Sequence, residues 1–180
     1  MKTRAVQIAF LLLCTVSAAA LQDMLPAFGG TKPPVLTALV LAWAVLEPRP
    51  RDRSGTPFHA ANWIPFALLA GAFEDALSGF PVGCATGFLV LAGAVARLVR
   101  PFAGMIATPV QGLVATVVAA ACHEAWLCMW GVVGDDPSGV VRFFASTLPA
   151  APVGAAAFTL LPRLVKATGF GGAETNGRWA

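Results

Sequence analysis

Long apolar stretches alternate with short polar ones along the chain. Six apolar runs are separated by segments rich in proline, glycine and charged residues. They fall at about residues 5–22, 34–47, 61–79, 82–99, 103–130 and 139–162. A helix needs about 20 apolar residues to cross the hydrocarbon core of a bilayer. Four of the six runs fit that length comfortably, so the pattern predicts a bundle of membrane-spanning helices.

The second and fifth runs depart from this length. The second has about 14 residues, unless its helix begins near Phe28 and includes Pro33 and Pro34 in its first turns, where a missing N–H group costs least. The fifth run is too long for one span. We therefore expect its spanning part to cover about 103–125, and Trp126 and Trp130 to lie in an interfacial extension.

Composition strengthens the membrane prediction. Of the 180 residues, 57% are hydrophobic and only 12% are charged, whereas soluble domains have about 25% charged residues. So few charges cannot cover the surface that a domain of this size exposes to water. A cytosolic enzyme and a disordered chain are thereby excluded. The net charge of +3 is no nucleic-acid footprint, because the basic residues lie between the apolar runs rather than in a patch.

The basic residues also predict an orientation. With a cytoplasmic N-terminus, six spans place ten of the twelve Lys and Arg residues inside and leave only Lys32 and Arg142 outside. Such a bias is the usual signal for the cytoplasmic side. The sequence therefore predicts one membrane domain over residues 1–180, with six spans and both termini in the cytoplasm.

A cleaved signal peptide is the alternative for the first run. Lys2 and Arg4 precede an apolar stretch that ends in Ala18-Ala19-Ala20, which has the form of a signal-peptidase site. Cleavage would leave five spans and the same charge bias, so the bias does not decide between the two. We expect the uncleaved, six-span form because the whole chain is so hydrophobic.

Two adjacent acids lie inside the third run, at Glu74 and Asp75. A carboxylate near the C-terminus of a helix opposes the helix dipole, so we expect a compensating contact. Neighbouring residues point about 100° apart, so one helix face cannot hold both acids. We predict that Asp75 faces the bundle and contacts Arg142 or, as second choice, His123. The alternative is that both acids are solvated near the headgroups.

Other polar residues indicate little chemistry. His123 and Glu124 are adjacent near the end of the fifth run, and we interpret them as an interfacial polar pair. They lack the second histidine of a zinc protease helix. A nucleophile with its base, a phosphate-binding loop or an active site of paired carboxylates is not recognisable. We therefore expect no enzymatic activity, metal or cofactor.

A stripe of glycines crosses the junction between the third and fourth runs. Ser78-Gly79-Phe80-Pro81 predicts a tight turn and an antiparallel hairpin. Gly79, Gly83 and Gly87 then repeat at four-residue spacing. Small residues at that spacing allow helices to approach closely, so we expect the stripe to pack against a neighbouring helix inside the fold.

The same junction resembles the MreD family of rod shape-determining membrane proteins. Members of that family carry the pattern G-x-x-x-D-x-x-S/G-x-x-P-x-G between the third and fourth spans, and a proline before the last basic cluster. The matching positions are Gly71, Asp75, Ser78, Gly79, Pro81, Gly83 and Pro162. The likeness in order and spacing covers roughly residues 28–166. The polar loop at about 48–60 is more basic and proline-rich than is usual in the family.

The resemblance implies a non-enzymatic component of the bacterial cell-elongation machinery in the inner membrane. It would work beside an MreC-like protein and the peptidoglycan synthases. It also implies a compact six-helix bundle similar to the substrate-binding components of energy-coupling-factor vitamin transporters. That likeness supplies the alternative function, a small-molecule binder for uptake, for which His123, Glu124, Trp126 and Trp130 would line an outer pocket.

Overall fold

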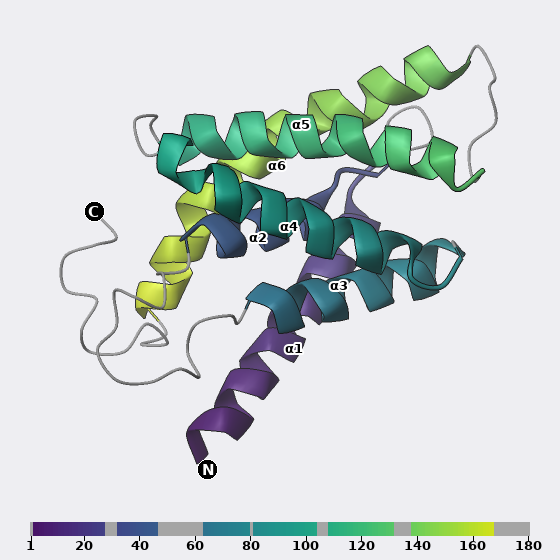
Figure 1. The fold of residues 1–180 in the computed structure, drawn as a ribbon. Coiled ribbons are helices and arrows are strands. Elements are labelled where there is room, and N and C mark those ends of the chain that lie inside the picture. Colours follow the sequence, from purple (N-terminus) through teal and green to yellow (C-terminus); the bar gives the residue numbers. More distant parts are fainter. Residues whose placement is uncertain are drawn as a thin grey trace.

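The computed structural model describes residues 2–27, 32–46, 63–79, 81–103, 108–131 and 138–167, and all regular structure within them is helical. One helix corresponds to each predicted apolar run, which confirms the all-α fold class (Figure 1). The helices are α1 (Lys2–Met24), α2 (Val35–Leu46), α3 (Trp63–Ser78), α4 (Cys84–Ala103), α5 (Thr108–Met129) and α6 (Ser138–Ala167).

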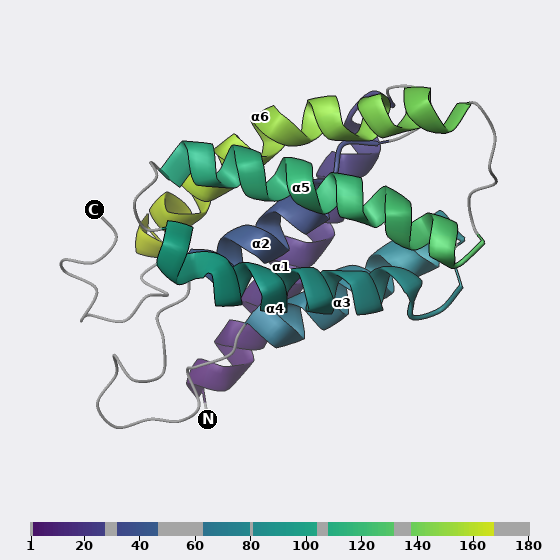
Figure 2. The same ribbon diagram turned by 45° about the horizontal axis from the view of Figure 1, so that its top comes forward.

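α2 lies at the centre of the bundle and packs against every other helix (Figure 2). Its residues are apolar around the whole circumference, and such a helix is stable only when it is buried on all sides. Ala38, Val40, Ala42 and Ala44 are all completely buried. At 12 residues, α2 is only about 18 Å long, which is shorter than the hydrocarbon core of a bilayer.

The start of α2 settles one open point of the sequence analysis. Pro33 and Pro34 precede the helix rather than lying within its first turns. The carbonyl of Pro34 accepts the first helical hydrogen bond, from the N–H of Ala38 at 3.0 Å. The structure therefore confirms the shorter helix for the second run, which begins after the two prolines.

The remaining helices pack around α2 in two antiparallel pairs and one single helix. α3 and α4 form the predicted hairpin, and α5 and α6 make the most extensive helix–helix contact in the molecule. The N-terminal half of α1 projects away from the bundle (Figures 1 and 2). Its C-terminal half packs on α2 and α3, where Thr15, Ala18 and Ala19 are buried.

Two helical segments are long and apolar enough to cross a membrane by length and composition, Thr108–Met129 in α5 and Phe143–Leu164 in α6. Shorter apolar segments occur in α1, α2 and α4. Large apolar side chains are exposed on the outer surfaces of the helices, among them Leu98, Val118 and Leu148. An apolar surface of this kind is typical of a protein that contacts lipid.

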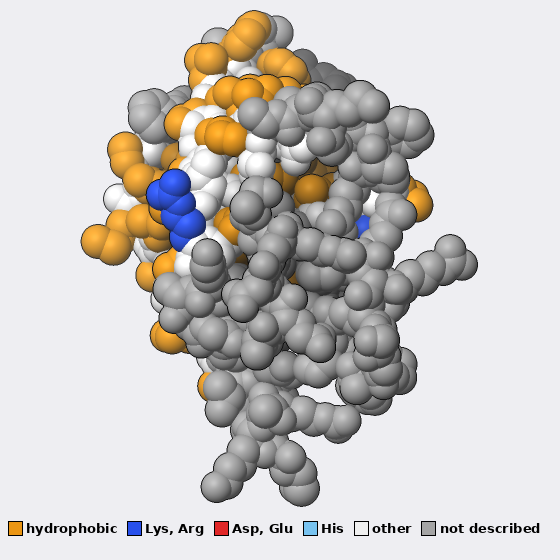
Figure 3. Space-filling model, turned by 90° about the vertical axis from the view of Figure 1, so that its left-hand side faces the viewer, with side chains coloured by type: hydrophobic (Ala, Val, Ile, Leu, Met, Phe, Trp, Pro, Cys, Tyr) orange, Lys and Arg blue, Asp and Glu red, His pale blue; other side chains and the backbone are white. Residues whose placement is uncertain are grey.

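Two glutamates and two arginines lie toward opposite ends of the bundle. Glu74 and Glu124 lie in the C-terminal parts of α3 and α5, whereas Arg97 and Arg163 lie in the C-terminal parts of α4 and α6, which run the other way. Figure 3 looks onto the end where α4 and α6 finish and shows basic and apolar side chains there. Arg97 donates a hydrogen bond of 3.5 Å to the carbonyl of Ala44 near the C-terminus of α2, where a positive charge is stabilised by the helix dipole.

Candidate functional site

The carboxylate of Asp75 binds the N-terminus of α4. It accepts hydrogen bonds from the backbone N–H groups of Gly83 at 2.9 Å, Ala85 at 2.7 Å and Thr86 at 3.3 Å, and from the Thr86 hydroxyl at 2.8 Å. The first N–H groups of a helix have no partner within the helix, and the helix dipole makes that end positive. Asp75 therefore serves α4 as an N-terminal cap supplied by a neighbouring helix.

The sequence led us to expect a compensating contact for this acid, and the N–H groups at the start of α4 provide one. Asp75 is 6% exposed and Glu74 is half-buried, so the acid predicted to face the bundle is the buried one. The donors shown for Asp75 belong to Gly83, just before α4, and to Ala85 and Thr86 in its first turn. The ring of His123, the second predicted partner, packs against Phe88. The side chain of Arg142 lies outside the described residues. The contact with Arg142 stays a prediction, and the N–H groups at the start of α4 already provide positive partial charge to Asp75.

The turn between α3 and α4 depends on two glycines. Gly79 has a φ of 70° and Gly83 a φ of 94°, values in the left-handed region that side-chain-bearing residues rarely adopt. The carbonyl of Pro81 accepts a 3.0 Å hydrogen bond from the N–H of Cys84, which begins α4. These residues shape the turn so that the first N–H groups of α4 point back at Asp75.

The prediction that the glycine stripe packs closely against a neighbouring helix is wrong. Gly79 and Gly83 precede α4 and have no atom within 4 Å of the place where a side chain would begin. Gly87 lies on α4, but an added Cβ would meet only Trp126, at an ordinary 3.6 Å. The four-residue spacing misled because it assumed that the helix already included the turn.

Close helix approach occurs at other glycines. A Cβ on Gly71 would lie 2.3 Å from the Cα of Thr86, so α3 and α4 touch there. At the crossing of α5 and α6, a Cβ on Gly154 would lie 2.2 Å from the carbonyl oxygen of Gly112 and 2.3 Å from the Thr116 hydroxyl. The sequence analysis missed Gly112 and Gly154. The sequence feature that could have indicated them is the presence of a small residue within an apolar run.

A cavity of about 280 Å³ lies beside this junction. It is lined by the C-terminal turns of α1 and α3, the first turn of α2, and facing parts of α5 and α6. Glu74, His123 and Glu124 contribute to its wall, so the structure brings these three candidates together. Asp23 and Lys32 form an ion pair at its exposed side.

Gln22 connects three helices at the wall of this cavity. Its side-chain carbonyl accepts a 3.2 Å hydrogen bond from the N–H of Leu36 near the start of α2, and its side chain also hydrogen-bonds Glu74. The sequence analysis missed this residue. Its signal was weak, since a single glutamine near the end of an apolar run is also typical of a solvated helix terminus.

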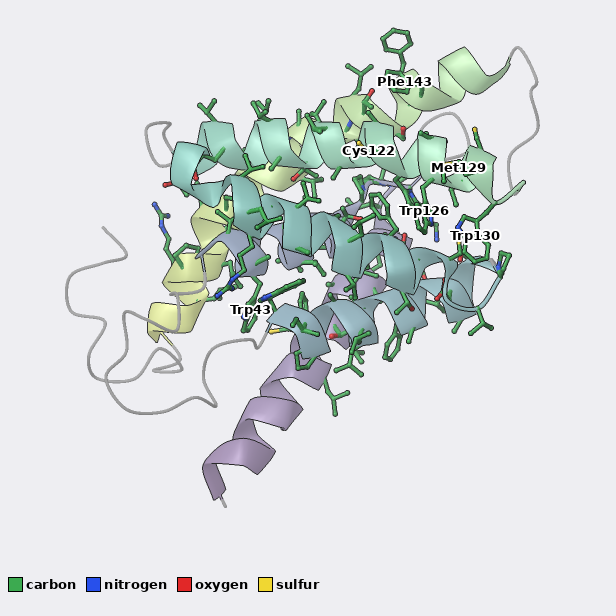
Figure 4. The ribbon with its side chains drawn as sticks, viewed as in Figure 1. Trp43, Cys122, Trp126, Met129, Trp130 and Phe143 are labelled. Atoms are coloured by element: carbon green, nitrogen blue, oxygen red, sulfur yellow. The ribbon has the colours of Figure 1, made fainter. Side chains whose placement is uncertain are left out.

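Two tryptophans lie near the C-terminal end of α5. α5 continues to Met129, so Trp126 lies within the helix. The indole N–H of Trp126 donates a 3.0 Å hydrogen bond to the carbonyl of Cys84. Figure 4 shows Trp126 and Trp130 on the side of α5 that faces the α3–α4 turn, whereas Met129 and Phe143 point outward. Neither tryptophan lines the cavity.

The histidine of the predicted polar pair is half-buried against an aromatic ring. The ring of His123 lies 4.7 Å from that of Phe88, centroid to centroid, and Glu124 is also half-buried. Among the described residues, no group of three or more His, Cys, Asp or Glu side chains is placed to hold a metal ion. Pro162 lies inside α6, which continues past it to Ala167.

Comparisons with known proteins give no further information about this site. No family model matches the chain, and neither does any curated protein or solved structure.

Proposed function

We propose that this protein is a non-enzymatic, MreD-like component of the bacterial cell-elongation machinery. In this proposal its helices form a six-span bundle in the inner membrane, with both termini in the cytoplasm. Its partners are an MreC-like protein and, through it, the peptidoglycan synthases that maintain rod shape.

One observation carries the proposal: residues of the resemblance converge on a single structural unit. Asp75 binds the N-terminus of α4, Gly83 supplies both a positive φ and one of the bound N–H groups, and Gly71 permits the contact with Thr86. Each of these residues has a physical requirement at its position. Positions with a structural requirement are the ones that a shared motif would retain, so their roles at this junction support the resemblance.

The test is copurification with the MreC-like protein of the same organism. We expect the full-length tagged protein, extracted in mild detergent, to retain that partner and Asp75→Asn to retain less of it. Val82→Ala is the matched control, because Val82 lies in the same turn and is 95% exposed. Absence of the partner from well-folded wild-type protein would contradict the proposal.

The alternative, a binding component for small-molecule uptake, is favoured by the cavity. A binding component of this kind should copurify with its ligand, which native mass spectrometry detects as a bound mass that denaturation removes. A retained ligand without an MreC-like partner would replace the proposed function by this alternative.

A further inference from the structure

Two prolines lie near the middle of α6, at Pro149 and Pro152. A proline inside a helix has no N–H to donate, and its ring clashes with the carbonyl four residues earlier. The carbonyls of Ala145 and Leu148 therefore lack their usual helical donor. α6 changes direction partway along its length (Figures 1 and 2), and interior prolines are a common cause of a bend in a helix.

Hydroxyl groups just before the prolines bind the backbone of the same helix. The Ser146 hydroxyl donates a hydrogen bond of 3.0 Å to the carbonyl of Phe143, and the Thr147 hydroxyl donates one of 2.8 Å to the same carbonyl. Hydroxyls bound in this way compete with the helical hydrogen bonds and tend to bend and slightly destabilise a helix. The hydroxyls and the prolines therefore weaken one stretch of α6, residues 143–152.

The N-terminal part of α6 is also held by little apolar contact. We define the arm as residues 138–148 of this helix. Among its described side chains, the arm buries those of Ser146 and Thr147. Beyond the prolines, α6 instead buries Phe158 and Leu161 in the hydrophobic core. The C-terminal part of α6 is therefore anchored more strongly than the arm, because segments with few buried apolar contacts open most easily.

A backbone contact fixes α6 directly after the prolines. A Cβ on Gly154 would lie 2.2 Å from the carbonyl oxygen of Gly112 in α5, so the two backbones touch at this crossing. The prolines lie between this fixed point and the arm. A hinge has the same arrangement, in which a few residues absorb the backbone rotation between two segments.

The arm forms part of the wall of the cavity. Ser146 lines the cavity from α6, and Ala120, His123 and Leu127 line it from α5. The remaining lining residues belong to other parts of the bundle. A movement of the arm relative to α5 therefore changes the width of the cavity.

We propose that the arm is a hinged wall that swings about residues 149–154 and opens the cavity. The structure shows the closed state, in which Ser146 is 7% exposed. In the open state, Ser146 and the facing residues of α5 become accessible to water. The inference depends neither on a role in cell elongation nor on the identity of a ligand.

Hydrogen–deuterium exchange of the full-length protein in detergent tests the hinge without any variant. It compares residues 143–148 of the arm with residues 119–125 of α5, which border the same cavity. We expect protection factors at least about tenfold lower in the arm, because opening of a weakly held segment exposes its N–H groups. Equal protection of the two segments overturns the proposal.

Variants then locate the hinge. Pro149→Ala combined with Pro152→Ala restores two N–H donors and should slow exchange in the arm about tenfold. Pro162→Ala is the matched control, because Pro162 lies in the same helix but beyond the crossing with α5. It should leave exchange in the arm unchanged. An arm that exchanges equally fast in the double variant and in the wild type would overturn the assignment of the hinge to these prolines.

Chemical labelling measures the opening of the cavity itself. Ser146→Cys places a thiol of similar size at the wall, and its reaction with a charged methanethiosulfonate is followed by peptide mass spectrometry. Leu161→Cys is the matched control, because Leu161 is buried to a similar extent, 6% exposed, in the anchored part of α6. We expect Ser146→Cys to react at least about tenfold faster than Leu161→Cys, and the two proline substitutions to slow it. A rate that these substitutions leave unchanged would mean that the reagent enters a static cavity, and the hinged wall would be wrong.

Discussion

At the scale of single residues, Asp75 connects two helices through one carboxylate. Its oxygens accept three backbone N–H groups and one hydroxyl at the start of α4. The negative charge also lies at the positive end of the α4 dipole. The neighbouring Glu74 points about 100° away, toward Gln22 and the cavity. Two adjacent acids of nearly the same chemistry therefore have different structural roles.

We predict that Asp75→Ala destabilises the protein more than Glu74→Ala does. Asp75→Ala leaves the first N–H groups of α4 without their acceptor, which should lower the free energy of unfolding by about 1–3 kcal/mol. Glu74→Ala removes a hydrogen bond to Gln22 and should cost less, about 1 kcal/mol. Thermal unfolding in detergent and the protein level in membranes measure the difference. Equal losses for the two variants would show that capping of α4 by Asp75 contributes little.

A second residue-scale prediction concerns Gly83. Its φ of 94° costs any residue with a Cβ about 1–3 kcal/mol, although space is open around it. Gly83→Ala should therefore lower the unfolding temperature through backbone strain and not through a clash. Val82→Ala, one position earlier and almost fully exposed, should have little effect. A fully stable Gly83→Ala protein would mean that the turn can change its conformation at no cost.

At the scale of helices, α5 and α6 meet in direct backbone contact at two glycines. Gly112 and Gly154 place the two backbones against each other, and the Thr116 hydroxyl is completely buried beside them. Among the described side chains, this hydroxyl is the one buried polar group without a hydrogen-bond partner. Close packing at small residues is the usual way in which apolar helices associate in a membrane.

We predict opposite effects for alanine at Gly154 and at Gly87. A Cβ on Gly154 would lie 2.2 Å from a backbone oxygen of α5, so Gly154→Ala should force the helices apart and cost about 1–3 kcal/mol. Gly87→Ala introduces only an ordinary contact and adds helix propensity of about 0.5–1 kcal/mol. Thermal unfolding in detergent measures both variants. If Gly154→Ala is as stable as Gly87→Ala, the α5–α6 crossing is looser than the structure has it.

At the scale of the whole molecule, alternating helix directions place the cavity and the acids toward one end and Arg97 and Arg163 toward the other. Under the proposed topology the cavity opens outward. We predict that reporter fusions after residues 55 and 170 are cytoplasmic and that one near residue 135 is external, because the basic residues remain inside. An external signal from the fusion after residue 55 would reverse the proposed orientation.

The mass of the mature protein supplies a separate check at this scale. Thr15, Ala18 and Ala19 of α1 are buried against the bundle, and removing residues up to Ala20 would expose the surface that they cover. We therefore expect an intact chain that retains α1. A measured mass for a chain that starts near Leu21 would show that the first run is a cleaved signal peptide.

The sequence by itself determined the number, order and approximate limits of the helices in the described part of the chain. Those features are local, because an apolar run between proline- and glycine-rich breaks has few other ways to satisfy its backbone. Helical periodicity was also enough to separate Asp75 from Glu74. It failed at Gly79 and Gly83, where the turn, and not the helix, sets the backbone conformation.

Only the tertiary structure decided which surfaces meet. It placed α2 at the centre of the bundle and the N–H groups of α4 against Asp75. It also brought Gly112 into contact with Gly154, and Gln22, Glu74 and Glu124 to the wall of one cavity. Apart from the contact of Asp75 with α4, these contacts join residues far apart in the chain. Apolar helices of similar composition offer many faces that pack almost equally well. The choice among them depends on shape and hydrogen bonding across the assembled bundle, which no single segment encodes.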